Sequence, residues 1–222
     1  MRTIKSSYMK KVLFVFFLLA SSFLNVTYGQ NINYREFGID VAGGIPQGLK
    51  EGETAPDFFG YDQTGKQVEL KKMLEKGPVI LFFYRGKWDS VCSRYLNNYQ
   101  DSLKVLTDIG FSMVAITPES IENVEQTIKL HNITFTVVYD CQEKIMKDYN
   151  VMFSVTKEYQ DKIKSGLSIS IAENNGRDEA RLPVPATFII SRDGIIVATQ
   201  FNPDFNKRAS VKWMLANLGH AL

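Results

Sequence analysis

A cysteine between an apolar run and a helix-like segment is the residue of this sequence best placed to do chemistry. Cys92 follows the run "PVILFFY" and precedes apolar residues at helical spacing. The start of a helix favours an anion through its free N–H groups and its dipole. A thiolate is such an anion, and it is the reactive form of cysteine. Arg85 adds positive charge close by in the sequence, so this pattern predicts a nucleophilic thiol at Cys92.

An aspartate three residues before this cysteine has two opposed effects. Asp89 is placed to cap the helix by accepting from the N–H of residue 92. It also brings a negative charge close to a thiolate, which raises the pKa of a cysteine. Arg85 would offset that charge either by pairing with Asp89 or by facing the sulfur, and the sequence leaves both arrangements open. Cys92, Arg85 and Asp89 are the candidate catalytic residues.

The second cysteine, Cys141, follows another expected strand, "FTVVYD", two places away from the strand before Cys92. Adjacent strands lie about 4.8 Å apart, so the two Cα atoms are expected on the order of 10 Å apart. A disulfide needs less than about 7 Å, and a resting Cys92–Cys141 bond is not expected. Cys141 is either a resolving cysteine or a small buried residue. The sequence has no C-x-x-C and no His–Cys cluster, so we predict neither a metal site nor a cofactor.

The N-terminus has the composition of a secretory signal peptide. Four basic residues precede a short apolar run over residues 12–20, and small and polar residues follow up to Gly29. We expect a signal peptide at residues 1–29, a leader at residues 30–48 and one domain at residues 49–222. The predicted location is therefore exported, either periplasmic or secreted. An uncleaved membrane anchor is the alternative.

The overall composition argues against one functional class, the nucleic-acid-binding proteins. The chain is 45% hydrophobic and 23% charged, a balance ordinary for a globular domain. Its basic residues are scattered and not clustered, which argues against a nucleic-acid binder. Removing the four basic residues of the signal peptide changes the net charge from +2 to −2. The net charge of the mature chain therefore does not indicate a binding partner.

The elements that must position Cys92 alternate between strand-like and helix-like patterns. A hairpin is expected within residues 58–70, with a short helix after it. Buried strands are expected at residues 78–84, 111–117 and 135–140. Each is followed by a helix, with helical apolar spacing at residues 96–109 and helices at residues 117–130 and 142–149. Residues 153–181 have weak periodicity, with a helix expected at residues 157–166. A hairpin around Arg192-Asp193-Gly194 and a last helix at residues 210–218 close the chain. The order predicts an α/β, thioredoxin-like fold: a central mixed β-sheet flanked by helices, with an N-terminal β-hairpin extension.

Five segments in order carry a family resemblance: "GETAPDF", "FFYRGKWDSVC", "AITPES", "LPVPATFIISRDG" and "FNPDFNKR". They resemble the alkyl hydroperoxide reductase C / thiol-specific antioxidant family, the peroxiredoxin-like branch of the thioredoxin fold. The most similar subgroup has F-Y-R-G-x-W-C-x-x-C at the turn, and this sequence has Asp89 in place of the first cysteine. Thioredoxins attack with that first cysteine, whereas peroxiredoxins attack with the last. The resemblance therefore implies a peroxidatic cysteine at Cys92 and no ordinary dithiol reductase.

Other positions depart from the family pattern. The peroxiredoxin proline falls on Arg85, its threonine on Asp89 and its supporting arginine on Pro185. Pro185 instead resembles the cis-proline of thioredoxins, and we expect a cis bond at Val184–Pro185. Arg85 is the expected substitute donor to a peroxide oxygen or a thiolate. The expected substrate groove contains Tyr84, Trp88, Thr117 and Pro185.

Two kinds of function fit these residues. The first is a thiol-based antioxidant oxidoreductase in which Cys92 reduces a hydroperoxide and an external thiol, such as a thioredoxin-like protein, reduces the sulfenic acid. The second is a catalytically silent binding protein, or a single-thiol partner in disulfide exchange, that uses the groove at cis-Pro185. Neither involves nucleic acid, or a membrane after signal cleavage. The state of Cys92 separates them.

Overall fold

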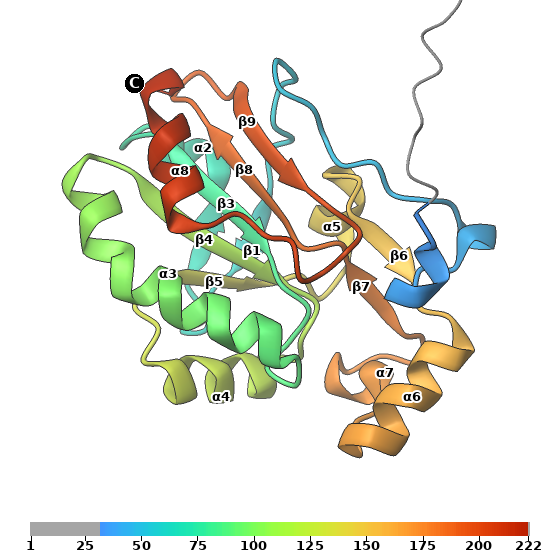
Figure 1. Ribbon diagram of the computed structural model, residues 1–222. Coiled ribbons are helices and arrows are strands. Elements are labelled where there is room, and N and C mark those ends of the chain that lie inside the picture. The colour runs from blue at the N-terminus through green and yellow to red at the C-terminus, as the bar shows by residue number, and fades with distance from the viewer. Residues whose placement is uncertain (1–31, 222) are drawn as a thin grey trace, which may run out of the picture. The chain divides into compact units, whose positions relative to one another are not determined.

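A five-stranded mixed sheet forms the centre of the protein in a computed structural model that describes residues 32–221 (Figure 1). The strands, in spatial order, are β5 (Thr136–Tyr139), β4 (Ser112–Thr117), β3 (Val79–Phe83), β8 (Ala186–Ile190) and β9 (Ile196–Phe201). The first three are mutually parallel, β8 is antiparallel to β3, and β9 is antiparallel to β8. The predicted fold class is thereby confirmed, including the late antiparallel hairpin. The predicted signal peptide lies outside the described residues.

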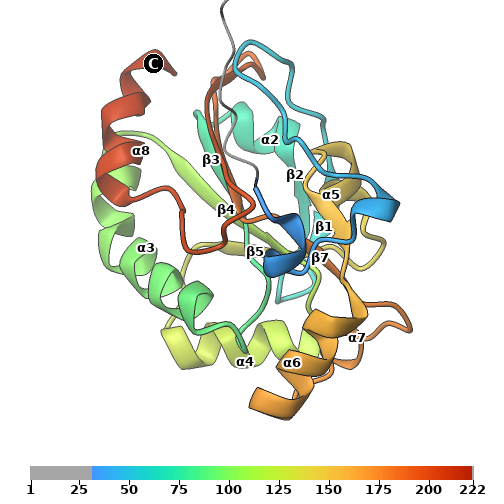
Figure 2. The same ribbon diagram turned by 45° about the vertical axis from the view of Figure 1, so that its right-hand side comes forward.

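Helices cover both faces of this sheet. All five residues of β3 are buried, as expected for an apolar run at the centre of a covered sheet. One face packs against α3 (Ser90–Asp108), α4 (Ile121–His131) and α8 (Val211–Asn217), and the other against α2 (Leu70–Leu74) and α5 (Lys144–Asp148) (Figures 1 and 2). Side chains alternate along a strand, so Phe82 belongs to the first apolar core and Phe83 to the second. The carboxyl end of β3 is therefore held from both sides.

The predicted N-terminal hairpin is present and lies beside the sheet edge. It consists of β1 (Phe59–Tyr61) and β2 (Gln67–Glu69), paired antiparallel. A bridge from Asp62 to Val138 joins the hairpin to β5. A Cβ on Gly60 would approach the Val138 side chain to 2.5 Å, so this contact requires glycine.

A second small sheet was not predicted. It pairs β6 (Met152–Ser154) with β7 (Arg181–Pro183), and the segment between them contains α6 (Lys157–Leu167) and α7 (Ile171–Asn174). The expected helix at residues 157–166 is confirmed as α6. The strands have three residues each, too short to show a period in the sequence.

Residues before the domain also have structure. Two 3₁₀ turns occur there, η1 (Tyr34–Phe37) and η2 (Val41–Gly43), and Ile39 between them is fully buried. The N–H of Asp40 donates to the carbonyl of Ser154 at 2.9 Å, which attaches this segment to β6. Residues 34–43, within the expected leader, therefore have defined structure.

One helix boundary differs from expectation. The helix expected from Thr117 begins later: Thr117 is the last residue of β4, and α4 is capped by Ser120, whose hydroxyl accepts from the N–H of Asn123. Helix α3 begins at Ser90, directly after Asp89, as the expected cap at Asp89 requires. Cys92 therefore lies in the first turn of α3, as predicted. Within residues 32–221, no helix combines the length and the apolar character needed to cross a membrane.

Candidate active site

The turn between β3 and α3 presents Cys92 at the end of the sheet where ligands meet open α/β folds. Asp89 is the N-cap of α3, and its Oδ1 accepts from the N–H of Val91 at 2.9 Å. The cap is thus confirmed, but its donor is residue 91 and not residue 92, as had been expected. Cys92 has 0% of its surface exposed. The sulfur therefore lies at a helix start and is sealed from solvent.

Arg85 and Asp89 form a buried ion pair beside this thiol. Arg85 contacts Asp89 Oδ2 through Nε at 2.8 Å and Nη2 at 2.7 Å. Its Nη1 donates to the hydroxyl of Tyr159, on α6, at 3.0 Å, and its guanidinium lies 3.8 Å from the ring centroid of Phe205. The question left open by the sequence is answered: the Arg85 side chain pairs with Asp89, while the Arg85 backbone N–H faces Cys92 Sγ at 3.3 Å.

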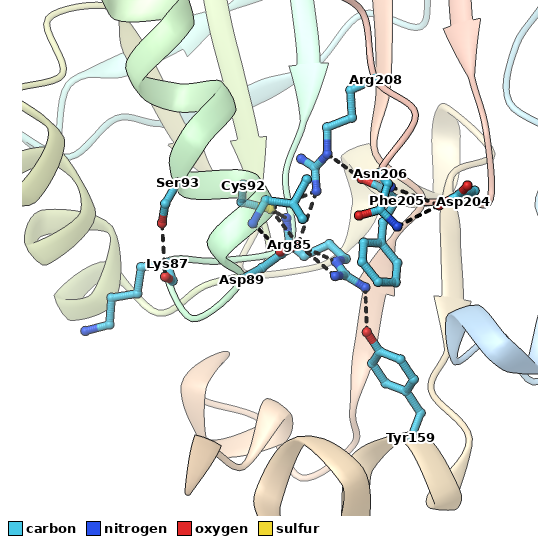
Figure 3. Close-up of polar contacts among 11 residues, drawn as sticks. Arg85, Lys87, Asp89, Cys92, Ser93, Tyr159, Asp204, Phe205, Asn206 and Arg208 are labelled. Atoms are coloured by element: carbon cyan, nitrogen blue, oxygen red, sulfur yellow. Dashed lines mark hydrogen bonds and ion pairs between the residues drawn. The ribbon is translucent and has the colours of Figure 1, made fainter. Parts of the chain in front are cut away.

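A second arginine, which sequence reasoning missed, completes the site. Arg208 lies in the loop after β9, and its Nη2 donates to Cys92 Sγ at 3.1 Å and to Asp89 Oδ2 at 3.1 Å (Figure 3). The thiol in turn donates to Asp89 Oδ2 at 3.0 Å. The sulfur is therefore surrounded by two N–H donors and one carboxylate. The motif "FNPDFNKR" contains Arg208 and had been used only as a family mark.

The charges in this cluster shift the pKa of Cys92 in opposite directions. Burial is the main cause that raises the pKa of Cys92 above its ordinary value; Arg208 and Arg85 lower it, and Asp89 raises it. Burial also favours the neutral form of Asp89, but Arg85 and Arg208 outweigh it, and the pKa of Asp89 lies below its usual value. The closed site thus contains a neutral thiol that donates to an ionised carboxylate. Two guanidiniums face one carboxylate, and loss of the thiol proton would balance their charge.

The space beside the sulfur is small. A cavity of about 10 Å³ touches Cys92, which is room for about one water molecule. Tyr84 and Pro185, two residues of the expected groove, line this cavity. Trp88 does not; its ring lies 5.3 Å from the Arg85 guanidinium and helps to cover it. Thr117 is also absent from the lining, and its hydroxyl accepts from the N–H of Glu119 at 3.3 Å.

The expected cis bond at Val184–Pro185 was wrong, since no peptide bond in residues 32–221 is cis. Trans is the intrinsically preferred form of an X–Pro bond, and the expectation of cis depended only on the resemblance to thioredoxins. The N–H of Val184 donates to the carbonyl of Val151 at 2.8 Å, continuing the pairing of β7 with β6. Ala186 directly after Pro185 already pairs with Phe201 on β9. Both neighbours of Pro185 are thus held by backbone hydrogen bonds.

Cys141 lies apart from the cluster, after β5. Both cysteines are free thiols, so the expected absence of a resting disulfide is confirmed. Cys141 is exposed, which contradicts its reading as a small buried residue. It lines a surface groove of about 330 Å³ between the β1 hairpin and α5. Among residues 32–221, no group of three histidine, cysteine, aspartate or glutamate side chains is arranged to hold a metal ion.

A buried glutamate supports the active-site turn from behind. Glu119 Oε1 accepts from the N–H of Lys87 at 2.9 Å and from Asn174, on α7, at 3.4 Å. Its Oε2 accepts from the hydroxyl of Thr127 at 3.2 Å. Burial raises the pKa of Glu119, and these hydrogen bonds partly offset it. The turn, α4 and α7 are thus joined through one carboxyl group, a link between distant segments that no local sequence pattern reveals.

This fold, with a thiol at the first turn of the helix after the central strand, defines the class of peroxiredoxin-type thioredoxin folds. The chain matches the AhpC/TSA family over residues 52–199. The protein therefore belongs to the AhpC/TSA family, and the predicted family is confirmed.

Individual relatives support this assignment. The chain is 28% identical over 94 residues to a putative peroxiredoxin of Mycobacterium tuberculosis (strain ATCC 25618 / H37Rv), covering 42% of this chain and 61% of that protein. It is 28% identical over 101 residues to the thiol-disulfide oxidoreductase ResA of Bacillus subtilis (strain 168), covering 45% of this chain and 55% of that protein. The alignments thus span little more than half the length of these relatives. The crystal structure of the peroxidoxin BcpB from Mycobacterium tuberculosis has a TM-score of 0.59 at 19% identity, over 78% of this chain and 96% of that one, and it shares the fold.

Proposed function

We propose that this protein is a peroxiredoxin-like thiol peroxidase that reduces hydroperoxides through Cys92 and is reduced by an external thiol. The observation that supports this most strongly is the contact of two N–H donors with one sulfur: Arg208 Nη2 at 3.1 Å and the Arg85 N–H at 3.3 Å. Donors aimed at a thiolate also stabilise the negative charge that develops on oxygen when a peroxide bond breaks. A thiol kept only for packing has no need of them.

The proposed reaction transfers one oxygen atom to the sulfur. Cys92 loses its proton and its Sγ attacks one peroxide oxygen, so that an S–O bond forms as the O–O bond breaks. The products are a sulfenic acid on Cys92 and the alcohol, or water, that carries away the thiol proton. Asp89, which accepts the thiol hydrogen bond at 3.0 Å, is placed to relay that proton. Arg85 and Arg208 stabilise the charge as it moves from sulfur to the leaving oxygen.

Reduction requires two thiol equivalents from outside. The first condenses with the sulfenic acid to give a mixed disulfide and water, and the second releases Cys92 and leaves with the disulfide. Cys141 is a free thiol that lines a groove which does not include Cys92, and this separation favours the external route over an internal disulfide. A structurally similar yeast mitochondrial 1-Cys peroxiredoxin is resolved through glutathione and thioredoxin systems.

We also propose that the protein is exported. The support is the sequence of residues 1–29, with a basic start, a short apolar run and a small residue near its end. A sequencing experiment on the N-terminus of the mature protein tests this: cleavage near Gly29 is expected, and an intact N-terminus would contradict it.

One observation favours a catalytically silent protein as the second candidate. Cys92 is fully buried, and burial raises its pKa, so the closed site alone is not reactive. The groove at Pro185 that this alternative requires is reduced to the small cavity next to the sulfur. Peroxide reactivity of Cys92 is therefore what separates the two candidates.

The test uses two single-cysteine variants of the mature protein. Cys141→Ser should form a sulfenic acid after addition of hydrogen peroxide, trapped by a dimedone-type probe and located by mass spectrometry. It should also consume peroxide continuously when dithiothreitol is supplied. Cys92→Ser is the matched control and should do neither. Equal labelling of both variants, or labelling of neither, would refute the peroxidase proposal.

A further inference from the structure

Two adjacent hollows lie along the first turns of α3. The inner hollow is the cavity of about 10 Å³ beside Cys92. The outer hollow is a surface groove of about 470 Å³ along α3 and the start of α8, a size typical of small-molecule sites. Tyr95 and Tyr99 are the residues that line both. These two rings therefore form the partition between the groove and the buried thiol.

Of these two rings, Tyr99 is fixed in place. Tyr99 is buried, and its hydroxyl donates to the carbonyl of Ala209 at 2.6 Å. Its ring packs edge-on against Phe82 with the centroids 4.9 Å apart. Moving it would break a buried hydrogen bond and open the apolar core.

Tyr95 is held more weakly. All residues that line the inner cavity are buried except Tyr95 and Arg208, which are partly exposed. Arg208 is anchored by Asp89 and by its Nε bond to the carbonyl of Phe205 at 2.8 Å. Within the described part of the chain, the hydroxyl of Tyr95 has no hydrogen-bond partner. The guanidinium of Arg208 lies 5.6 Å from its ring centroid and that of Arg94 lies 5.9 Å from it, and the ring packs edge-on against Tyr99 with the centroids 5.9 Å apart.

We infer that Tyr95 is the gate to Cys92. Reactants approach through the outer groove and reach the sulfur when the Tyr95 ring swings away from Arg208. The gate then selects reactants by size, because the closed cavity admits about one water molecule. Tyr95 is in this role an access and specificity residue and takes no part in the chemistry. The inference rests on the proposed function only in taking Cys92 as the reacting thiol.

The other possible entry passes through the aromatic cover over Arg85. Phe205 lies on the Arg85 guanidinium at 3.8 Å, with Trp88 and Tyr159 next to it. Opening there would require Phe205 to move. Removal of the Phe205 ring is therefore the matched comparison for removal of the Tyr95 ring.

The experiment measures alkylation of Cys92 in a Cys141→Ser background with two neutral reagents, small iodoacetamide and larger N-ethylmaleimide. Both react with the thiolate, so a change in thiol pKa alters both rates alike, and their ratio reports access. Neither needs peroxide, so an inactive peroxidase would not obscure the result. Tyr95→Ala should raise the N-ethylmaleimide rate about tenfold, since only two weak cation–π contacts and one edge-on contact with Tyr99 hold the ring closed, and should raise the ratio of the two rates.

Three comparisons decide the outcome. Tyr95→Phe should match the parent, because the hydroxyl has no partner, and Tyr95→Trp should slow the larger reagent further. Phe205→Ala should leave the ratio unchanged. A ratio that is unchanged in both Tyr95→Ala and Tyr95→Trp would overturn the inference. So would an increase in Phe205→Ala equal to or larger than that in Tyr95→Ala. Tyr95→Trp keeps the test decisive if Tyr95→Ala does not fold.

Discussion

Cys92 and Cys141 each follow the carboxyl end of a parallel strand, yet their surroundings differ in almost every respect. Cys92 is buried at a helix start and contacts Arg85, Asp89 and Arg208. Cys141 is exposed in an open groove. Solvent access and a charged environment thus occur at different thiols of this protein. Under the proposed function, exposure alone does not identify the reactive cysteine.

The largest expected effect comes from removing the carboxylate at Cys92. Asp89→Asn leaves the buried guanidiniums of Arg85 and Arg208 without a counter-charge and should lower the free energy of unfolding by about 3–5 kcal/mol. The matched control near Cys141 is Asp148→Asn, which breaks the exposed helical pair with Lys144 and should cost no more than about 0.5 kcal/mol. Denaturant unfolding measures both. Similar losses in the two variants would show that the buried pair has no special role.

The next effect is on the reactivity of Cys92 alone. The charge of Arg208 lowers the pKa of this thiol, so Arg208→Gln should raise that pKa and remove one donor to the reacting atoms. The rate of peroxide oxidation should fall on the order of 100-fold, with its pH profile displaced to higher pH. Stopped-flow kinetics in the Cys141→Ser background measures this change.

Two controls accompany that variant. Arg208→Lys retains the charge and should recover part of the rate. Alkylation of Cys141, measured in a Cys92→Ser background, should be the same with Arg208→Gln as without it. A parallel loss at both cysteines would point to general unfolding and contradict the role given to Arg208.

A smaller effect is the dependence of stability on pH. Because the pKa of Asp89 is lowered in the folded protein, its ionised form stabilises the fold above the unfolded pKa of about 3.9. That contribution is lost as pH falls through the lower, folded pKa. The difference in unfolding free energy between the parent and Asp89→Asn should therefore be full at pH 6 and narrow below about pH 4. A difference that stays constant down to pH 2.5 would contradict the assigned shift.

The smallest effect on the free energy of unfolding is expected from Glu119→Gln, next to the active-site turn. Burial raises the pKa of Glu119, so ionisation of this carboxyl is less favourable in the folded protein than in the unfolded chain. Glu119→Gln keeps the Oε1 acceptor for Lys87 and removes the charge, while Thr127 can accept from the new amide. The change in unfolding free energy should stay within about 1 kcal/mol, and Glu119→Ala should cost clearly more. Equal losses would show that the hydrogen bonds of Glu119 do not hold the turn.

The sequence was most informative where the chemistry is local. Cys92, Arg85 and Asp89 lie within eight positions of one another, so strand end, helix start and cap together predicted their proximity. Hydrophobic patterns in the sequence likewise predicted the central strands and the two hairpins, because apolar runs are typical of strands in a sheet whose faces are covered.

What could not be predicted depends on contacts between distant segments. Arg208 is 116 residues from Cys92 and reaches it from an irregular loop. Tyr159 reaches Arg85 from α6, in the segment with the weakest periodicity. The cis bond expected at Pro185 depended on a resemblance to thioredoxins, whereas the bond is trans. None of these contacts leaves a periodic or spacing signal in the sequence.

The most direct test compares the reactivity of Cys92 and Cys141 toward two reagents in the unmodified mature protein. One sample receives less than one equivalent of hydrogen peroxide, and a second receives less than one equivalent of iodoacetamide. Peptide mapping then locates each modification. We predict that peroxide oxidises Cys92, where Arg85 and Arg208 stabilise the reaction, and that iodoacetamide alkylates exposed Cys141. Oxidation of Cys141 ahead of Cys92 would contradict the claim that the buried, charged cluster is the peroxide-reactive site.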